Sequence, residues 1–451
     1  MIKNIELFRT ELEKVNEWWV TGKVREAEKY LYKREKFNQL VKETDSRRIS
    51  IILGARRVGK SILLKHTISY LLKSVNPRNI LYLSLDDPSL QTHSDSLIKD
   101  AVEYFLDNIA KEGRKFIFLD EVQSFSEWYK WLKAFYDRGL DIKFFLSGSS
   151  SLSLQKEANK YLRGRSQETE LFPLSFYEFT KLKGLEIQKP ELENVLKMDE
   201  FEIKELWYKL KESFNEYLLV GGFPEWFEIK RDSQEWFSRL INDVPKKAIY
   251  EDVANLFGIK NTKTLELILA FIAANQSKIL AYETINEVVK LDHQTLTNYI
   301  EFLKSSYLIV EILKYASLKH QLKAKRKYLI IDQGLRNAML KDYEVRESNA
   351  GFIIENLIGI NLYIKTKEKQ ENIYYISNGE VDFILKNKET VLVEVKYQNK
   401  ISEGDIKNML KFMENFKVNR GILATKDVLK VETRGNKRIL FIPVWLLLLA
   451  L

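Results

Sequence analysis

The chain of 451 residues contains no cysteine, only seven prolines and only four histidines. The absence of cysteine excludes disulfide bonds and thiolate chemistry. The histidines are scattered singly, at His66, His93, His293 and His320, which argues against a zinc site. Any metal chemistry must therefore use carboxylates.

Long hydrophobic runs are also lacking. The first 15 residues are too charged for a secretion signal, and the apolar stretch from Ile439 is short and interrupted by Pro443. We therefore expect a soluble, cytoplasmic protein with no membrane partner.

Charge and length indicate several domains and a polyanionic partner. Hydrophobic residues make up 45% of the chain, charged residues 30%, and the formal net charge is +9. The hydrophobic fraction is sufficient for packed cores, and the length suggests about three domains. The positive charge favours nucleic acid, although many soluble proteins carry a similar excess.

The strongest motif lies between Ile49 and Tyr70, where an apolar β-branched run leads through a glycine-bounded loop into a helical pattern. The loop has the spacing G-x-x-x-x-G-K-S, in which backbone N–H groups and a helix N-terminus cradle phosphates. We expect ATP to bind at Gly54, Ala55, Arg56, Arg57, Val58, Gly59, Lys60, Ser61 and Ile62. Lys60 would reach the β- and γ-phosphates, and Ser61 would ligate Mg²⁺. A glycine turn with an exposed lysine is the alternative.

Strand-like runs at 49–53, 80–85, 116–119 and 142–146 alternate with helical stretches, which predicts a parallel sheet. The third run ends in Asp120 and Glu121. We expect Asp120 to hold Mg²⁺ through water and Glu121 to polarise the attacking water. Ser147, after the fourth run, is a candidate contact for the γ-phosphate or the water. The alternatives are a solvent-facing acid pair and a Gly-Ser turn.

Two arginines follow, in the segment LRGR at 162–165. An arginine placed at a neighbouring subunit's γ-phosphate would stabilise charge during phosphoryl transfer. Arg163 and Arg165 are candidates for that role, which would imply a homo-oligomer. A surface salt bridge is the alternative.

The order GARRVGKS, FIFLDEVQ, FFLSGSSS, LRGR and LFPLSFYEF (171–179) resembles AAA-superfamily ATPases of archaea and bacteria that carry a C-terminal restriction-endonuclease-like domain. The resemblance continues in GGFPE (221–225) and KYLIIDQGL (327–335), and it covers most of the chain from about residue 30. The resemblance implies the domain architecture of this chain but says less about its biological role.

Residues 263–337 show the pattern of a winged helix: helices at 264–274, 282–289 and 292–303, then strands at 307–313 and 328–331. Asp292 is expected to cap the third helix, whose outward side chains suit DNA contacts: His293, Gln294, Thr297 and Asn298. The hairpin carries a cationic run suited to phosphates: Lys314, Lys319, Lys323, Lys325, Arg326 and Lys327. A rigid packing module with a solvated hairpin tip is the alternative.

Carboxylates recur near the C-terminus. Glu355 lies in a helical pattern, Asp382 on a strand pattern, and Glu394 and Lys396 two residues apart on the next. This order resembles the active site of restriction-endonuclease-like nucleases. It implies that Asp382 and Glu394, assisted by Glu355, bind Mg²⁺ and that Lys396 activates water or hydroxide. Glu380 would substitute for Asp382 or merely flank it. A spent site or surface ion pair is the alternative.

The expected fold class is α/β: N-terminal helices (1–46), a P-loop ATPase core (47–180), a helical lid (181–262), a winged helix (263–340) and a restriction-endonuclease-like domain (341–451). We expect an ATP- and Mg²⁺-dependent enzyme acting on DNA, with a nuclease domain controlled by nucleotide. The alternatives are a signalling ATPase that assembles with nucleotide and has an inactive nuclease-like domain, and a DNA-binding regulator that hydrolyses ATP slowly.

Overall fold

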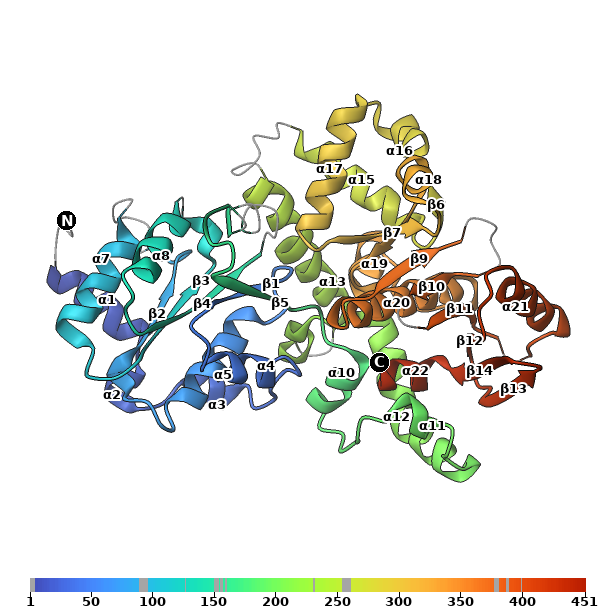
Figure 1. Ribbon diagram of the computed structural model, residues 1–451, viewed down its shortest axis with the longest axis horizontal. Helices are drawn as coiled ribbons and strands as arrows, with labels where there is room; N and C mark the ends of the chain where they lie inside the picture. Colours follow the sequence, from blue (N-terminus) through green and yellow to red (C-terminus); the bar gives the residue numbers. More distant parts are fainter. Residues whose placement is uncertain are drawn as a thin grey trace. The chain divides into compact units, whose positions relative to one another are not determined.

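The computed structural model describes residues 5–88, 96–125, 127–149, 154, 157, 158, 160–229, 232–253, 261–376, 381–386, 389–398 and 400–451. The chain divides into two compact units, Met1–Leu171 with Ser305–Tyr307, and Phe172–Lys304 with Leu308–Leu451 (Figure 1). Each unit is built around its own sheet.

The first unit contains a five-stranded parallel sheet in the order β2-β3-β4-β1-β5. Four strands confirm the expected runs: β1 (Ile49–Leu53), β2 (Ile80–Ser84), β3 (Lys115–Asp120) and β4 (Ile142–Gly148). The edge strand β5 (Ser166–Glu170) was not expected, because its sequence SQETE lacks an apolar run and pairing with β1 defines it.

Helices cover both faces of this sheet. Figure 1 shows α7 (Leu97–Tyr104) and α8 (Trp128–Asp137) on one face, and α4 (Phe37–Glu43) and α5 (Lys60–Leu71) on the other. In the N-terminal segment, where helices were expected, the described part forms four: α1 (Ile5–Val15), α2 (Trp18–Thr21), α3 (Arg25–Lys29) and α4. The left-handed conformation of Gly22, which ends α2 at φ 69°, helps to divide the segment.

The second unit begins with helices α10 (Phe176–Leu182), α11 (Leu192–Val195), α12 (Glu200–Val220) and α13 (Ser233–Ile241). Helix α12 ends at Val220, directly before Gly221-Gly222. Three separate motifs meet there. The Leu174 N–H donates to the Gly222 carbonyl at 2.7 Å, and the Gly222 N–H donates to Asp332 at 2.7 Å.

Asp332 also caps the helix α19 (Gln333–Leu340), where it accepts from the Leu335 N–H at 3.0 Å. A Cβ added at Gly222 would lie 2.4 Å from the Leu174 carbonyl oxygen, and one added at Gly334 would lie 2.0 Å from the Val220 carbonyl oxygen. These glycines are therefore required because backbones approach closely, so this part of the family resemblance reflects packing.

The next segment has helices α15 (Thr262–Ala274), α16 (Tyr282–Val289) and α17 (His293–Ser305), close to the expected ranges. Asp292 accepts from the Thr295 N–H at 2.9 Å, which confirms it as the cap of α17. Strands β7 (Ile309–Lys314) and β8 (Arg326–Ile330) lie close to the two expected strands, and the short strand β6 (Ile279–Leu280) pairs with β8. The hairpin tip is not an open loop, because it contains the short helix α18 (Leu318–Lys323).

The hairpin belongs to the same sheet as the C-terminal strands. This nine-stranded sheet has the order β13-β14-β12-β11-β10-β9-β7-β8-β6, and β7 pairs in parallel with β9. The remaining strands are β9 (Asn372–Tyr375), β10 (Phe383–Lys386), β11 (Thr390–Lys396), β12 (Arg420–Thr425), β13 (Lys430–Arg434) and β14 (Lys437–Pro443). Helices α20 (Glu347–Glu368) and α21 (Glu403–Asn415) pack against it.

The apolar C-terminal stretch becomes β14 and the buried helix α22 (Val444–Ala450). The Trp445 ring packs on Trp207 of α12, with ring centroids 5.3 Å apart. Among the described residues, none of the helices combines the length and apolarity that crossing a bilayer requires.

Candidate functional site

The P-loop connects β1 to α5 as expected. Gly59 has φ 95°, in the left-handed region that glycine adopts easily. Lys60 is 3% exposed, and its ammonium donates to the carbonyl oxygens of Gly54 and Ala55 at 3.2 and 3.1 Å. The same ammonium lies 3.5 Å from Glu121 Oε1. The loop thus holds a buried positive charge above its own backbone.

The other residues expected in the loop differ in exposure. Ala55 and Val58 are buried, Arg56 and Ile62 are partly buried, and Arg57 is exposed with φ 66°. Arg56 lies close enough to Glu121 to lower the pKa of that carboxyl.

Asp120 ends β3 in a hydrogen-bonded network. Its carboxylate accepts from the hydroxyls of Tyr82, at 2.6 Å, Ser61 and Ser147. Burial and the neighbouring Glu121 raise the pKa of Asp120, while the three hydroxyls oppose the rise. The two residues expected to hold Mg²⁺, Ser61 and Asp120, therefore contact each other, and their oxygen donors suit that ion.

Glu121 has a left-handed backbone, with φ 51°. Its N–H donates to Ser147 Oγ at 3.1 Å, and its carboxylate accepts from Gln123 Nε2 at 2.5 Å. Burial opposes its charge, but Lys60 and Gln123 outweigh burial and lower its pKa. Glu121 is therefore held ionised, as a residue that polarises water must be. Ser147 joins both acids.

Sequence reasoning missed Tyr82 and Lys65. Tyr82 lies on β2, and the ammonium of Lys65 lies 3.8 Å from the centre of its ring. Burial lowers the pKa of Lys65, which faces a cavity of about 420 Å³ lined also by Ser61, Ile62 and Tyr82. Two sequence positions could have indicated these residues. Tyr82 lies on the strand that neighbours the strand of Asp120, and Lys65 follows Ser61 by one helical turn.

The two candidate arginines differ. Arg165 forms an ion pair with Asp137 of α8, with Nη2 3.1 Å from Oδ1. Arg163 is exposed. Arg165 thus makes the surface ion pair that was its alternative, which leaves Arg163 as the more accessible candidate for a role in a neighbouring subunit.

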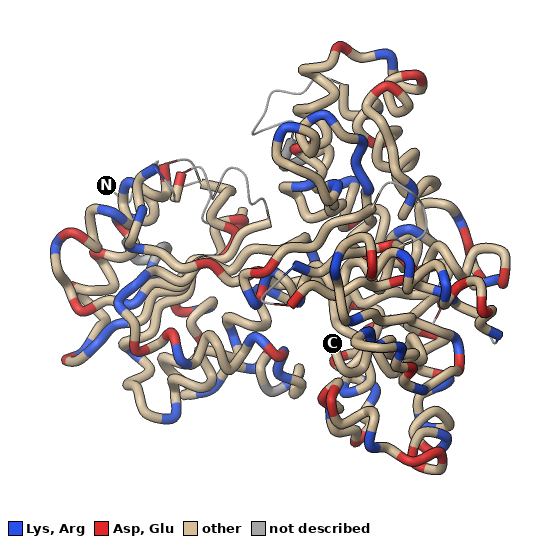
Figure 2. Tube along the Cα trace, turned by 45° about the vertical axis from the view of Figure 1, so that its right-hand side comes forward, with Lys and Arg blue, Asp and Glu red and all other residues tan. Residues whose placement is uncertain are grey.

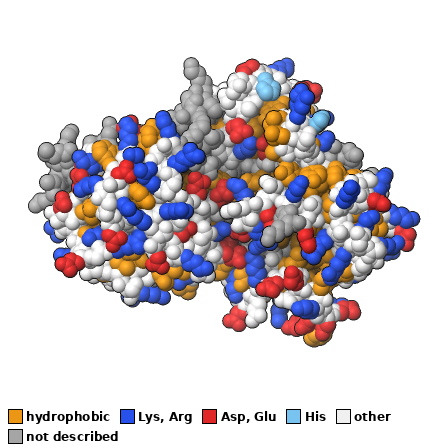
Figure 3. All heavy atoms as spheres, in the orientation of Figure 1, with side chains coloured by type: hydrophobic (Ala, Val, Ile, Leu, Met, Phe, Trp, Pro, Cys, Tyr) orange, Lys and Arg blue, Asp and Glu red, His pale blue; other side chains and the backbone are white. Residues whose placement is uncertain are grey.

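The expected DNA-binding surface lies in the second unit. His293, Gln294 and Asn298 of α17 are exposed, and Thr297 is partly buried. Lys319, Lys323 and Lys325 are exposed, and Lys314 is partly buried. Figure 2 shows Lys and Arg interspersed with Asp and Glu along both units, so net charge alone does not mark a surface. Figure 3 shows basic, histidine and apolar side chains mixed over the α16–α18 region.

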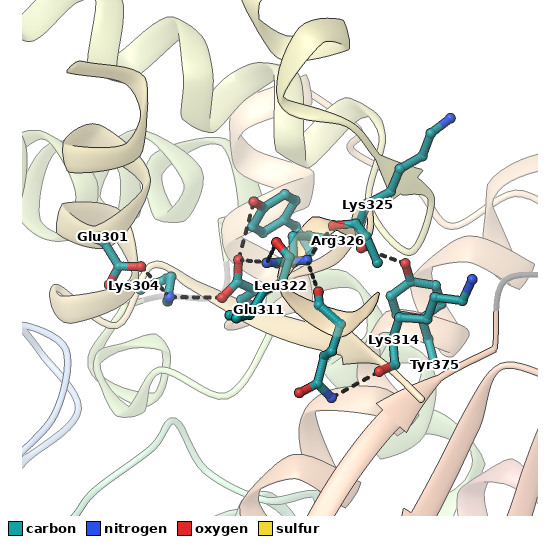
Figure 4. Close-up of polar contacts among 11 residues, drawn as sticks. Glu301, Lys304, Glu311, Lys314, Leu322, Lys325, Arg326 and Tyr375 are labelled. Atoms are coloured by element: carbon teal, nitrogen blue, oxygen red, sulfur yellow. Dashed lines mark hydrogen bonds and ion pairs between the residues drawn. The ribbon is translucent and has the colours of Figure 1, made fainter. Parts of the chain in front are cut away.

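Figure 4 shows what holds α17, α18 and the hairpin together. Glu311 of β7 pairs with Lys304 of α17 at 2.9 Å and with Arg326 of β8 at 3.3 Å. Arg326 also donates to the carbonyl oxygens of Gln321, Leu322 and Ala324, which caps α18. The side chain of Lys325 extends away from this network.

Two members of the expected cationic run were misassigned. Arg326 is 9% exposed and Lys327 is 4% exposed, so neither is available to a phosphate backbone. Strand alternation inside a shared sheet explains this, because residues of β8 face packed elements on both sides. Arg326 serves the network around Glu311, and Lys327 points to the C-terminal acids.

The elements carrying those acids were predicted correctly, except that Asp382 directly precedes β10 instead of lying on it. Lys327 Nζ is 2.5 Å from Glu355 Oε1 and 3.8 Å from Asp382 Oδ1. Asp382 Oδ2 accepts from the Val395 N–H at 2.8 Å. Burial and Asp382 raise the pKa of Glu355 to about 7.

Glu394 and Lys396 form the other half of the expected nuclease site. Lys396 Nζ is 2.9 Å from Glu394 Oε1 and 3.5 Å from Asp405 Oδ1 of α21. Burial raises the pKa of Glu394 to about 7, and its Oε2 is buried without a hydrogen-bond partner. Glu380 lies outside the described residues. Within those residues, three or more acids or histidines nowhere come together as a metal site.

Comparisons with known proteins identify a described family for the core of the first unit. Residues 46–180 match the AAA domain family, whereas residues 211–344 and 350–447 match domains of unknown function, DUF8612 and DUF4143. An uncharacterized protein of Methanocaldococcus jannaschii is 29% identical over 84% of this chain and 82% of its own length. One from Haemophilus influenzae is 25% identical over 93% of this chain and 99% of its own length.

A solved structure of the Aeropyrum pernix ORC1 protein in complex with DNA matches 68% of this chain and 91% of that one, at 12% identity and a TM-score of 0.30. With Lys60, Asp120 and Glu121 brought together at the ends of β1 and β3, residues 46–180 are an AAA-type P-loop ATPase domain, followed by two domains of unknown function.

Proposed function

We propose that this protein binds and hydrolyses Mg-ATP in its first unit and contacts DNA through α17 and α18 of its second. The observation that carries the ATPase part is the network joining Lys60, Ser61, Asp120, Glu121 and Ser147. These residues come from the ends of neighbouring parallel strands, where α/β sheets bind ligands.

Each residue then has one task. Lys60 binds the β- and γ-phosphates, for which it exchanges its present carbonyl partners. Ser61 and Asp120 hold Mg²⁺, which neutralises phosphate charge when bound. Glu121 orients the attacking water, and Ser147 fixes the two acids relative to each other through its bonds to both. Arg163 is the candidate that would complete a neighbour's site in an oligomer.

Two substitutions test the ATPase. Lys60→Ala should abolish nucleotide binding, while Glu121→Gln should retain ATP and lower its hydrolysis about 100-fold or more, within the usual range for a general base. The exposed Lys73 and Glu127 provide matched controls, Lys73→Ala and Glu127→Gln, which should behave as the unmodified protein. Normal turnover in the Glu121→Gln variant would refute the role of Glu121.

The DNA-binding part is supported by the exposed polar face of α17, by the exposed Lys319 and Lys323 of α18, which Arg326 caps, and by the exposed Lys325 that follows α18. Replacing these three lysines by alanine should weaken DNA binding and lower the slope of log affinity against log salt by up to about 3. Alanine at Lys204, Lys209 and Lys211 of α12 removes the same charge elsewhere as a control. Equal effects of the two triple variants would refute a specific surface.

The C-terminal domain has two candidate roles. Cleavage of DNA is favoured by the unpaired Oε2 of Glu394 beside Lys396. A binding role without cleavage is favoured by Lys327, which pairs with the other two acids. Cleavage lost in Asp382→Ala would support the first role. ATP-dependent change in oligomer size with no cleavage under any divalent metal would support the second.

A further inference from the structure

Lys327 is a buried cation between two acids. It is 4% exposed, and its ammonium lies 2.5 Å from Glu355 Oε1, 3.8 Å from Asp382 Oδ1 and 3.4 Å from the Asp382 carbonyl oxygen. The ring of Phe383 covers it, with the ring centre 4.4 Å away. Every one of these partners comes from the segment with the expected nuclease site, although Lys327 itself belongs to the hairpin.

The register of the shared sheet explains how this lysine reaches the acids. A Cβ added at Gly359 of α20 would lie 2.7 Å from Leu329 Cδ1, so Leu329 faces α20. Lys327 is two residues earlier on β8 and points to the same side. Glu355 is one helical turn before Gly359 and faces the same strand. Both side chains are therefore directed to one point by regular secondary structure.

The protein itself supplies a cation there. Two neighbouring, partly buried carboxylates are stabilised by a cation, and in a metal-dependent nuclease site Mg²⁺ supplies it. Here an ammonium supplies it instead. A divalent ion between Glu355 and Asp382 would have to displace Lys327 or lie against its charge, and burial prevents solvent from screening that repulsion.

The second acid pair follows the same rule, since Lys396 Nζ lies between Glu394 and Asp405. Among the residues that the structure describes, these acids thus face lysine ammonium groups and do not form a cluster that could hold a metal ion.

We propose that Lys327 takes the place of a divalent cation between Glu355 and Asp382, so that the C-terminal domain binds no metal at these acids. This inference does not depend on the ATPase or on α17 and α18. It goes beyond the proposed function by selecting the role without DNA cleavage and by assigning the buried lysine as the reason.

Titration with Mn²⁺ tests the proposal, with free ion followed by electron paramagnetic resonance in the absence of nucleotide. The unmodified full-length protein and its isosteric variant D382N should give the same isotherm. The variant K327M should bind one additional Mn²⁺ at Glu355 and Asp382. Its affinity there should exceed that of the unmodified protein at least about tenfold, because the competing charge is removed. The double variant K327M/D382N should lose that site.

The exposed neighbour Lys325 provides the control, and K325M should match the unmodified protein. Mn²⁺ binding by the unmodified protein that disappears in D382N would overturn the proposal. So would a K327M variant with an unchanged circular dichroism spectrum and no additional site. The comparison with D382N needs no change at Lys327, so it decides the proposal even if K327M fails to fold.

Discussion

Asp332 should make the second unit less stable as pH rises from 4 to 7. This carboxyl is 3% exposed and accepts from the N–H groups of Gly222, Gly334 and Leu335. Burial raises its pKa from the ordinary 3.8 to about 6, although these N–H groups oppose the rise. The charged carboxylate is therefore less favourable in the folded protein than in the unfolded chain.

The sign follows from proton binding. Between pH 4 and 6 the folded protein retains the proton of Asp332 and the unfolded chain releases it, so stability falls as pH rises. A pKa change from 3.8 to about 6 corresponds to about 3 kcal/mol, which is fully lost above the folded pKa.

The variant Asp332→Asn removes this titration. Its absolute stability depends on how well an amide replaces the carboxylate, but its stability relative to the unmodified protein should improve by about 2.5 kcal/mol between pH 4 and 7, because part of the linkage already lies below pH 4. Hydrogen exchange of the peptide that contains the Gly222 amide, corrected for intrinsic exchange at each pH, measures this locally. A difference between the two proteins that does not change with pH would refute the reasoning.

Three further outcomes are expected. Lys143 is buried on β4, and burial lowers its pKa from 10.5 to about 8, so the folded protein loses this proton before the unfolded chain does. The free energy of unfolding should therefore rise by up to about 3 kcal/mol between pH 8 and 10.5. Urea unfolding should show this rise in the unmodified protein but not in Lys143→Met. Gly222→Ala should lower thermal stability by about 2 kcal/mol or more because of contact with the Leu174 carbonyl, whereas Gly351→Ala, with nothing within 4 Å, should be neutral or stabilising. Tyr82→Phe removes a 2.6 Å hydrogen bond to Asp120 and should lower Mg²⁺-dependent ATP hydrolysis about tenfold or more, and unchanged Mg²⁺ dependence of the rate would contradict that role.

Much of the first unit could be predicted from local sequence. Its buried parallel strands are continuous apolar runs, and the P-loop spacing is imposed by phosphate geometry, so β1 to β4 and the positions of Lys60, Asp120 and Glu121 were recognisable. The edge strand β5 was not, because a polar strand carries no such signal and only its partner β1 defines it. Tyr82 was missed for the same reason, since its hydroxyl becomes important only when β2 lies beside β3.

The second unit shows where sequence reasoning ends. The helices, the cap at Asp292 and the order of the C-terminal acids depend on local periodicity and were predicted. The cationic run looked uniform, yet Lys325 extends outward while Arg326 and Lys327 are buried. The sequence by itself determined only which residues are basic and how they are spaced. Only the shared sheet decided which faced solvent and which faced Glu355 and Asp382, because side-chain direction follows strand register and register follows tertiary pairing.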